Sequence, residues 1–256
     1  YFIYNMFKLK RDWFKILKNF QVLIILYIIM AILLIGFRAR IWDDFSHWLL
    51  TVKNMFLFNQ LSNNENSTIF FKTYPPATAI IQYFYNFVGG IGFENLEYNS
   101  QFITNYFVMI LLLSIINMIQ LSKKSKIILY SVLFLIPAIF NTEIYISLYV
   151  DAILAIMGAY LIIFYEYMKK QQNNSKFEYL NIALGVLFLS LIKSTGTAIV
   201  IFYLIYVVID LILTRKYGFN LKIIFTILFS LFIGKQSWNY YLFKTKADTI
   251  WEPAKI

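Results

Sequence analysis

The sequence contains no cysteine, and this absence excludes several kinds of chemistry at once. Without cysteine the chain has no disulfide framework, no thiolate nucleophile and no cysteine-ligated metal site. Histidine is almost as scarce, because His47 is the single copy in 256 residues. Charged residues are scarce too, at 14% of the chain against about a quarter in an ordinary soluble domain.

Apolar side chains are abundant instead and make up 60% of the residues. This composition predicts an integral membrane protein. The formal net charge of +10 does not indicate a nucleic-acid partner, because the lysines and arginines cluster in short segments between apolar runs. We therefore expect membrane lipids around the chain and no nucleic acid.

Seven apolar runs could cross a hydrocarbon core of ~30 Å as helices. They are 20–37, 102–121, 127–140, 150–168, 180–192, 197–213 and 221–234, of which the third, fifth and seventh are short. The first is not a cleavable signal peptide, because bulky Arg38, Arg40 and Trp42 follow it. The chain begins at Tyr1 and stops in a polar stretch, so we expect it to be part of a longer protein with further C-terminal spans. The predicted fold class is all-α, a polytopic transmembrane bundle.

Basic residues alternate between the loops, and this alternation predicts the orientation. They are Lys8, Lys10, Arg11, Lys15 and Lys18 before the first span, Lys123, Lys124 and Lys126 after the second, Lys169, Lys170 and Lys176 after the fourth, and Arg215, Lys216 and Lys222 after the sixth. The turn 141–149 has none. By the positive-inside rule the N-terminus is cytoplasmic, in the cell membrane, and residues 6–20 form an interfacial helix on the inner leaflet.

The segment 38–101 is too long for a simple connector, and we expect it to fold on the outer side. Apolar residues recur at helical spacing through 45–56. The opposite, polar stripe consists of Asp44, His47, Thr51 and Asn54. This pattern predicts an amphipathic helix along the outer interface. Pro75 and Pro76 then break the chain, and a second apolar helix starts behind them.

Asp43 and Asp44, in RIWDDFSHW, lie at the outer end of the first span. An aspartate is a favoured helix N-cap, but a cap needs only one carboxylate. Two adjacent carboxylates repel each other unless a cation, a base or a substrate proton is near, so we favour a functional role for the pair. Either one could be a general base that deprotonates a hydroxyl, or a ligand for a divalent cation, Mg²⁺ or Mn²⁺, that bridges to phosphate.

Two aromatic side chains are further candidates for substrate contacts. His47 lies three residues beyond Asp44 on the same helix face, where it could orient a substrate or help to bind a metal. The alternative for this lone histidine is a surface or interface position. Tyr74, in TYPP, either contacts the substrate or belongs to the interfacial aromatic belt.

Lys193 interrupts two apolar stretches in LFLSLIKSTGTAIVIF and precedes small, polar residues. It either contacts an anionic phosphate or snorkels to the interface. Asp151, at the outer start of the fourth span, either binds substrate or caps its helix, and Glu143 lies just before it. These polar groups gather at the outer face, whereas a transporter usually keeps them near the midplane, so we favour an interfacial enzyme.

The order of these motifs resembles the multi-spanning bacterial membrane glycosyltransferases of the GT-C fold, which include protein O-mannosyltransferases and lipid A aminoarabinose transferases. The shared pattern is a first span, WDDFSHW at its outer end, TYPP in the same loop, SLYVDAIL opening a later span, and LIKSTG. It covers roughly Phe20 to Trp238.

The resemblance implies an inverting transferase that takes a sugar from a polyprenyl-phosphate donor at the outer leaflet and passes it to a glycan, lipid or protein acceptor of the cell envelope. Asp44 or Asp43 would then be the base, with Asp44 preferred because it starts the polar stripe, and Lys193 would steady the leaving phosphate. Some family members use a divalent cation and others do not. Two alternatives remain: a flippase or transporter of a lipid-linked or small polar substrate, and a polysaccharide polymerase or ligase.

Overall fold

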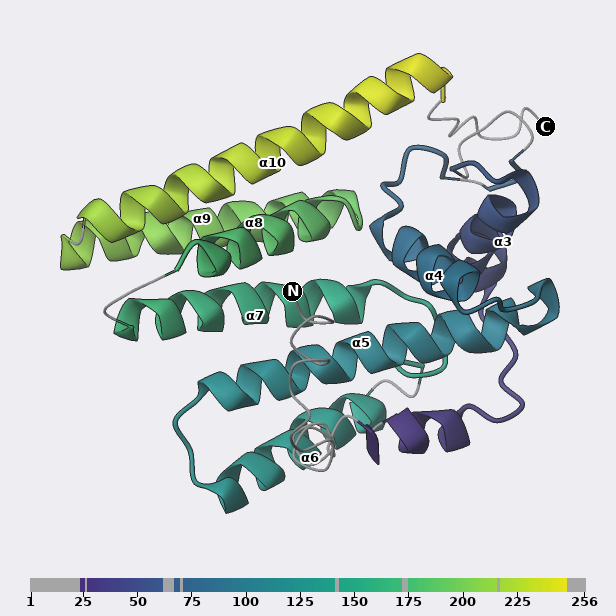
Figure 1. Cartoon of the computed structure of the whole chain (residues 1–256), viewed down its shortest axis with the longest axis horizontal. Helices are drawn as coiled ribbons and strands as arrows, with labels where there is room; N and C mark the ends of the chain where they lie inside the picture. The colour runs from purple at the N-terminus through teal and green to yellow at the C-terminus, as the bar shows by residue number, and fades with distance from the viewer. Residues whose placement is uncertain are drawn as a thin grey trace, which may run out of the picture.

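The computed structural model describes residues 24–25, 27–61, 67–69, 71–140, 143–171, 175–215 and 217–247. Every regular element of these residues is helical, which confirms the predicted all-α class (Figure 1). The elements are η1 (Asp44–Trp48), α3 (Leu49–Phe58), α4 (Ala77–Val88), η2 (Phe93–Asn95), α5 (Leu96–Met118), α6 (Lys123–Phe140), α7 (Asp151–Lys170), α8 (Lys176–Ser190), α9 (Ser194–Thr214) and α10 (Tyr217–Thr245). The interfacial helix predicted over 6–20 lies outside the described residues, as does the beginning of the first predicted span.

Four of the described helices are long and apolar enough to cross a membrane, which indicates a membrane protein. They are Phe93–Met118, Asp151–Lys170, Ser194–Thr214 and Tyr217–Thr245. Two of the three short predicted spans, 127–140 and 180–192, are largely helical, in α6 and α8, but do not belong to this group. The total of seven spans therefore stays a prediction.

Two helices, α5 and α10, differ most in extent from the runs predicted for them. α5 begins at Leu96 instead of 102, because polar side chains of its first turns are satisfied inside the protein; Gln101 Nε2, for example, donates to the carbonyl oxygen of Ser147 at 2.9 Å. α10 extends to Thr245, well beyond 234. Its polar C-terminal part is held by the indole of Trp238, whose Nε1 donates to the carbonyl oxygen of Thr73 at 3.0 Å. A prediction from apolar runs alone does not include these polar helix ends.

The helices pack as a bundle in which α5 contacts α6 and α7, and α8 contacts α7, α9 and α10. Fully buried apolar side chains such as Leu161, Ile182 and Val200 form its centre. Large apolar side chains on α9 and α10 remain exposed, including Phe202 and Phe232. Exposed apolar surface of this extent on long helices is what a lipid-facing wall presents.

The helix ends and connecting segments gather at two opposite ends of the bundle (Figure 1). The end of α5 and the start of α6, the end of α7 and the start of α8, and the end of α9 and the start of α10 lie together at one end, with Lys123, Lys170, Lys176 and Arg215 at or beside these helix ends. The helices η1, α3 and α4 lie at the other end, together with the start of α7 and the start of α9. We call this second end the acidic end, after Asp43, Asp44, Glu143 and Asp151. The alternating loop charges predict this segregation, while the orientation in a membrane stays a prediction.

The segment between the first two predicted spans folds, as its length predicts. α4 begins at Ala77, directly behind Pro76, and packs on α3 and α5. Glu97 at the start of α5 ties the segment down, because its carboxylate accepts from Lys53 Nζ at 2.7 Å and from the backbone N–H of Ala39 at 3.3 Å. These contacts tie α3 and the residues before η1 to the start of α5.

Candidate functional site

The site is built on a π-helical turn. The helix that starts at 42 widens into η1 and continues as α3, so the backbone is locally unwound where Asp44 and His47 lie. Single π turns inside α-helices occur frequently at functional sites. The widened turn is the first feature that singles out this segment.

The polar stripe of this helix faces inward, which corrects the prediction of an amphipathic helix on the interface. Asp44, His47, Thr51 and Asn54 are buried, and so are Trp48, Leu49, Val52 and Met55 of the apolar stripe, whereas Phe45 is exposed. The burial is possible because polar partners meet the stripe: Thr51 Oγ1 donates to the His47 carbonyl oxygen at 2.7 Å, and Asn54 Nδ2 donates to Ser67 Oγ at 3.1 Å. Helical spacing located the stripe but not the loops that cover it.

Asp44 is fully buried, at 0% exposure. Its Oδ1 accepts the backbone N–H of Leu148 at 3.0 Å, while Oδ2 has no hydrogen-bond partner among the described residues. Burial raises the pKa of Asp44 to about 6; the Leu148 hydrogen bond opposes this rise, and the charges of Asp43 and Glu143 add to it. A carboxylate with this pKa is mostly ionised at pH 7 yet basic enough to take a proton.

The helix-capping alternative for the aspartates is not observed. Asp43 stands at the N-cap position of η1, but its side chain makes no capping hydrogen bond. The carboxylate of Asp44 leaves its own helix and reaches the turn before α7. Burial raises the pKa of Tyr149. The charge of Asp43 and a hydrogen bond between the Tyr149 hydroxyl and Asp43 raise this pKa further. Both carboxylates are thus joined to the turn 143–150.

His47 lies in an aromatic cage beside Asp44. Its ring centroid is 4.6 Å from that of Trp48, 5.2 Å from Tyr74 and 5.5 Å from Phe71, with the rings edge to face. Burial, together with the nearby charge of Lys193, lowers the pKa of His47 to about 4. The imidazole is therefore neutral at pH 7, and its Nδ1 has no partner among the described residues.

Lys193 joins the site from the other side. Its Nζ lies 3.5 Å from Asp151 Oδ1, and its charge acts on His47. The turn that holds it is tight, because a Cβ on Gly196 would collide with the carbonyl oxygen of Leu189. The backbone N–H of Ala77 donates to the Leu191 carbonyl oxygen at 2.9 Å and so binds the TYPP loop to the same turn.

All predicted site residues therefore meet at the acidic end, although they come from four parts of the chain. They are Asp43, Asp44, His47, Tyr74, Asp151 and Lys193. Within the described residues no group of three or more histidine, aspartate or glutamate side chains is arranged to hold a metal ion. The predicted divalent cation at Asp43 and Asp44 stays a prediction, and no step proposed below involves it.

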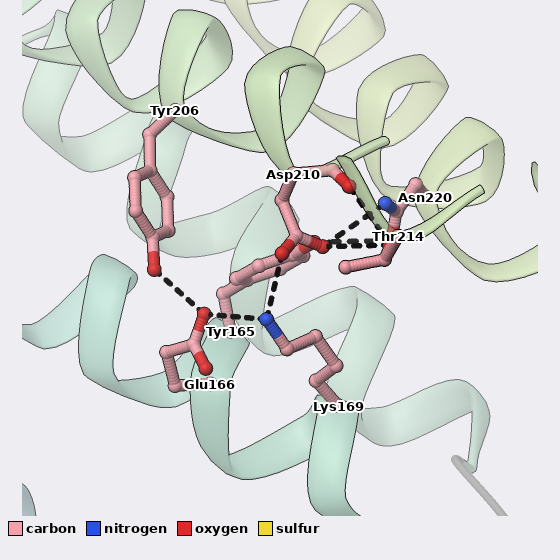
Figure 2. A network of polar contacts seen from close by, with 7 residues as sticks. All are labelled: Tyr165, Glu166, Lys169, Tyr206, Asp210, Thr214 and Asn220. Carbon is pink, nitrogen blue, oxygen red and sulfur yellow. Dashed lines mark hydrogen bonds and ion pairs between the residues drawn. The ribbon is translucent and has the colours of Figure 1, made fainter. Parts of the chain in front are cut away.

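A second polar cluster, which the sequence reading missed, lies at the basic end (Figure 2). It consists of Tyr165, Glu166 and Lys169 on α7, Tyr206, Asp210 and Thr214 on α9, and Asn220 on α10. Lys169 Nζ lies between two carboxylates, 3.0 Å from Glu166 Oε1 and 2.7 Å from Asp210 Oδ1. Glu166 and Asp210 each sit inside an apolar run, and ionisable residues within spans are a signal that could have located the cluster.

Hydroxyl and amide groups complete this cluster. The Tyr165 hydroxyl donates to Asp210 Oδ2 at 2.6 Å, and the Tyr206 hydroxyl donates to Glu166 Oε1 at 2.6 Å. Asn220 Nδ2 donates to Asp210 Oδ2 at 3.2 Å. Because three helices contribute side chains, the cluster joins α7, α9 and α10 opposite the candidate site.

A polar pair on α5 was also missed. Gln101 and Asn105, one helical turn apart, donate to backbone carbonyls of the turn that carries Leu148, including the Tyr145 carbonyl oxygen at 2.8 Å from Asn105 Nδ2. Amide side chains at i and i+4 in an apolar run are the sequence signal for such a role. These two side chains thereby fix the turn whose Leu148 N–H donates to Asp44.

Comparisons with protein-family models, with characterised proteins and with solved structures found no match to this chain. The fold and the site thus define an all-helical protein with four helices able to cross a membrane and a buried aspartate at one end. Any functional proposal rests on these residues and their geometry.

Proposed function

We propose that the protein is an integral membrane glycosyltransferase that moves a sugar from a polyprenyl-phosphate donor to an acceptor hydroxyl at the outer face of the cell membrane. The order of its motifs, which resembles that of GT-C glycosyltransferases, is the starting point. The convergence of those motifs at one end of the bundle supports the proposal, because residues far apart in sequence meet around one carboxylate.

The observation that carries the proposal is the state of Asp44. It is fully buried, one oxygen is held by a backbone N–H, and the other oxygen has no partner among the described residues. A buried carboxylate oxygen without a hydrogen bond is costly to maintain and calls for an explanation, which proton transfer from a substrate would supply. Its pKa of about 6 suits a general base that works near neutral pH.

The proposed reaction is a single inverting displacement. Asp44 Oδ2 takes the proton of the acceptor hydroxyl while that oxygen forms a bond to the anomeric carbon of the sugar. The bond between the anomeric carbon and the phosphate oxygen breaks, and the electron pair leaves with the polyprenyl phosphate. Lys193, charged and partly exposed at the same end, stabilises the negative charge that develops on this leaving phosphate.

An apolar groove offers a place for the polyprenyl chain of the donor. It measures about 510 Å³ and lies between α4, α8 and α10, with Pro76, Leu187 and Trp238 among its lining residues. Leu191, which also lines it, is two residues from Lys193. A lipid whose chain lies in this groove would carry its phosphate close to the lysine.

A transporter of a lipid-linked or small polar substrate is the second candidate. The cluster around Lys169 favours it, because ionisable side chains within membrane helices often mark the path of an ion or proton. Against it, every charged group of that cluster already has a protein partner. We therefore rank transport below transfer.

A donor panel separates the two functions. Sugar transfer is measured with the protein in nanodiscs, supplied with labelled sugars on polyprenyl phosphate. Uptake is measured with the protein in proteoliposomes and the same donors outside. We expect transfer without uptake, lost in Lys193→Ala and largely restored in Lys193→Arg, which keeps the charge. Uptake without transfer from any donor would reject the transferase in favour of a transporter.

A further inference from the structure

A small cavity opens beside the aspartates. It lies where the turn 143–150 meets the first turn of α7 and measures about 220 Å³. Its lining consists of Ile144, Ser147, Tyr149, Asp151 and Ala152. Three of these side chains carry hydroxyl or carboxylate groups, so the cavity offers hydrogen-bond donors and acceptors, unlike the apolar groove described above.

The turn that lines this cavity is hydrogen-bonded to the proposed base, Asp44. Leu148, between Ser147 and Tyr149, donates its N–H to Asp44 at 3.0 Å, and the Tyr149 hydroxyl hydrogen-bonds Asp43. Gln101 Nε2 fixes the same turn through the Ser147 carbonyl oxygen at 2.9 Å. The cavity is thus held in a defined position next to both carboxylates before any ligand arrives.

One lining residue of the cavity contacts Lys193. Asp151 lines the cavity and lies 3.5 Å from Lys193 Nζ. A phosphate at Lys193 would therefore lie close to one lining residue of the cavity. Asp44 does not line the cavity but is joined to the turn that does, through the hydrogen bond from Leu148.

The size of the cavity limits what can enter. At roughly 30 Å³ per water molecule, its volume equals that of about seven waters. Sites for drug-sized ligands run from about 300 Å³ upward, so this cavity suits one small ring and excludes an oligosaccharide. A small polyol matches both the volume and the mixture of donors and acceptors in the lining.

We propose that this cavity binds one sugar ring and that Ser147, Tyr149 and Asp151 read the hydroxyl groups of that ring. In the proposed transferase, on which the identity of the ring rests, it is the single sugar carried by the donor phosphate. The donor is then a polyprenyl-phosphate monosaccharide, and Tyr149 and Ser147 determine which monosaccharide is accepted.

Two alanines on α7 provide a matched test. Ala152 lines the cavity, whereas Ala155, one turn further along α7, is exposed and does not. Ala152→Leu fills the cavity, and Ala155→Leu adds the same side chain outside it. Saturation-transfer NMR on the protein in nanodiscs then measures binding of free glucose, mannose, galactose and N-acetylglucosamine.

We expect saturation transfer to at least one of these sugars with the original chain and with Ala155→Leu, and at least a tenfold weaker signal with Ala152→Leu. Tyr149→Phe, which removes only a hydroxyl, should change the preference between two epimers by about threefold to tenfold, the worth of one hydrogen bond. This binding assay does not depend on turnover. Sugar binding that follows this pattern without any sugar transfer would uphold the cavity and reject the transferase.

Two results would overturn the cavity proposal whatever the transfer assay shows. One is equal binding by the Ala152→Leu and Ala155→Leu variants. The other is no binding of any of the four sugars by the original chain. Circular dichroism and thermal unfolding of each variant confirm that the helices are intact.

Discussion

Asp44 and His47 lie three residues apart, and the protein shifts the pKa of each away from its ordinary value. Burial raises the pKa of Asp44 from 3.8 to about 6 and lowers that of His47 from 6.5 to about 4. Both shifts disfavour the charged form, but they act on stability in opposite directions with pH. The stability that Asp44 contributes is present at low pH and lost as the pH rises through 6. The contribution of His47 is present above pH 6.5 and lost as the pH falls through 4.

Single variants should separate these two contributions between pH 7 and pH 5. In Asp44→Asn only the pH-dependent contribution of His47 remains from this pair. The free energy of unfolding should therefore fall by about 2 kcal/mol between pH 7 and pH 5. In His47→Gln only the aspartate remains, and the protein should become more stable over the same interval. Thermal unfolding in detergent at several pH values measures both slopes. Asp43, Glu143 and Lys193, whose charges act on the pair, are unchanged in both variants. Parallel slopes in the two variants would contradict the assigned shifts.

The sequence identified the residues of this site but not their environment. Asp43, Asp44, His47, Asp151 and Lys193 were all found from residue type and position relative to apolar runs, and the structure brings them together. The burial of the polar stripe could not be predicted, because it depends on contacts between segments about a hundred residues apart, such as Leu148 with Asp44. Side-chain periodicity reports which residues share a face, not what covers that face.

At the scale of helices, Gly196 sets the distance between α8 and α9. A Cβ at this position would collide with the Leu189 carbonyl oxygen. Gly196→Ala should therefore push the start of α9 away, destabilise the protein by about 1–3 kcal/mol and displace Lys193. Thermal unfolding provides the measurement.

Gly218→Ala is the matched control for that substitution. Gly218 lies in the first turn of α10, and a Cβ there would meet no atom within 4 Å. Alanine favours a helix over glycine by up to about 1 kcal/mol, so this variant should be as stable as the original or more stable. Equal destabilisation by both substitutions would show that the close approach at Gly196 is not the cause.

The cluster around Lys169 links three helices and should contribute to their packing. Asp210→Asn removes the ion pair with Lys169 and weakens the hydrogen bond from Tyr165, and we expect a loss of about 1–3 kcal/mol. Unfolding of the reconstituted protein by denaturing detergent measures this loss. Leu213→Ala, at an exposed position of the same helix outside the cluster, should change stability by less than about 0.5 kcal/mol. A neutral Asp210→Asn would contradict a structural role and strengthen the case for transport.

For the whole molecule, the separation of acidic and basic ends leads to a test of orientation. Because the chain has no cysteine, single cysteines can be introduced without removing any. Thr68 is exposed at the acidic end, and Gln171 is exposed in the basic turn after α7. A membrane-impermeant maleimide should label Thr68→Cys on intact cells and Gln171→Cys only after permeabilisation. The reverse pattern would place the candidate site in the cytoplasm and contradict a reaction at the outer face.

The fold class is confirmed, whereas the total number of spans stays a prediction. Composition alone identifies a helical membrane protein, but helix ends are decided by polar contacts that a hydropathy pattern does not contain. α10 shows this clearly, because the contact between Trp238 and the Thr73 carbonyl oxygen supports a helix that is far longer than its apolar run. Its 29 residues extend over roughly 44 Å, more than the hydrocarbon core of a bilayer.

The central claim is that Asp44 is the base of a sugar transfer, and a single-turnover measurement tests it most directly. Asp44→Asn and Asp43→Asn are compared with the original protein in nanodiscs at pH 7.5, with donor binding and sugar transfer followed separately. The account predicts that Asp44→Asn binds the donor normally but transfers sugar about 10²- to 10⁴-fold more slowly, while Asp43→Asn loses less than tenfold. Transfer by Asp44→Asn at the original rate would contradict it.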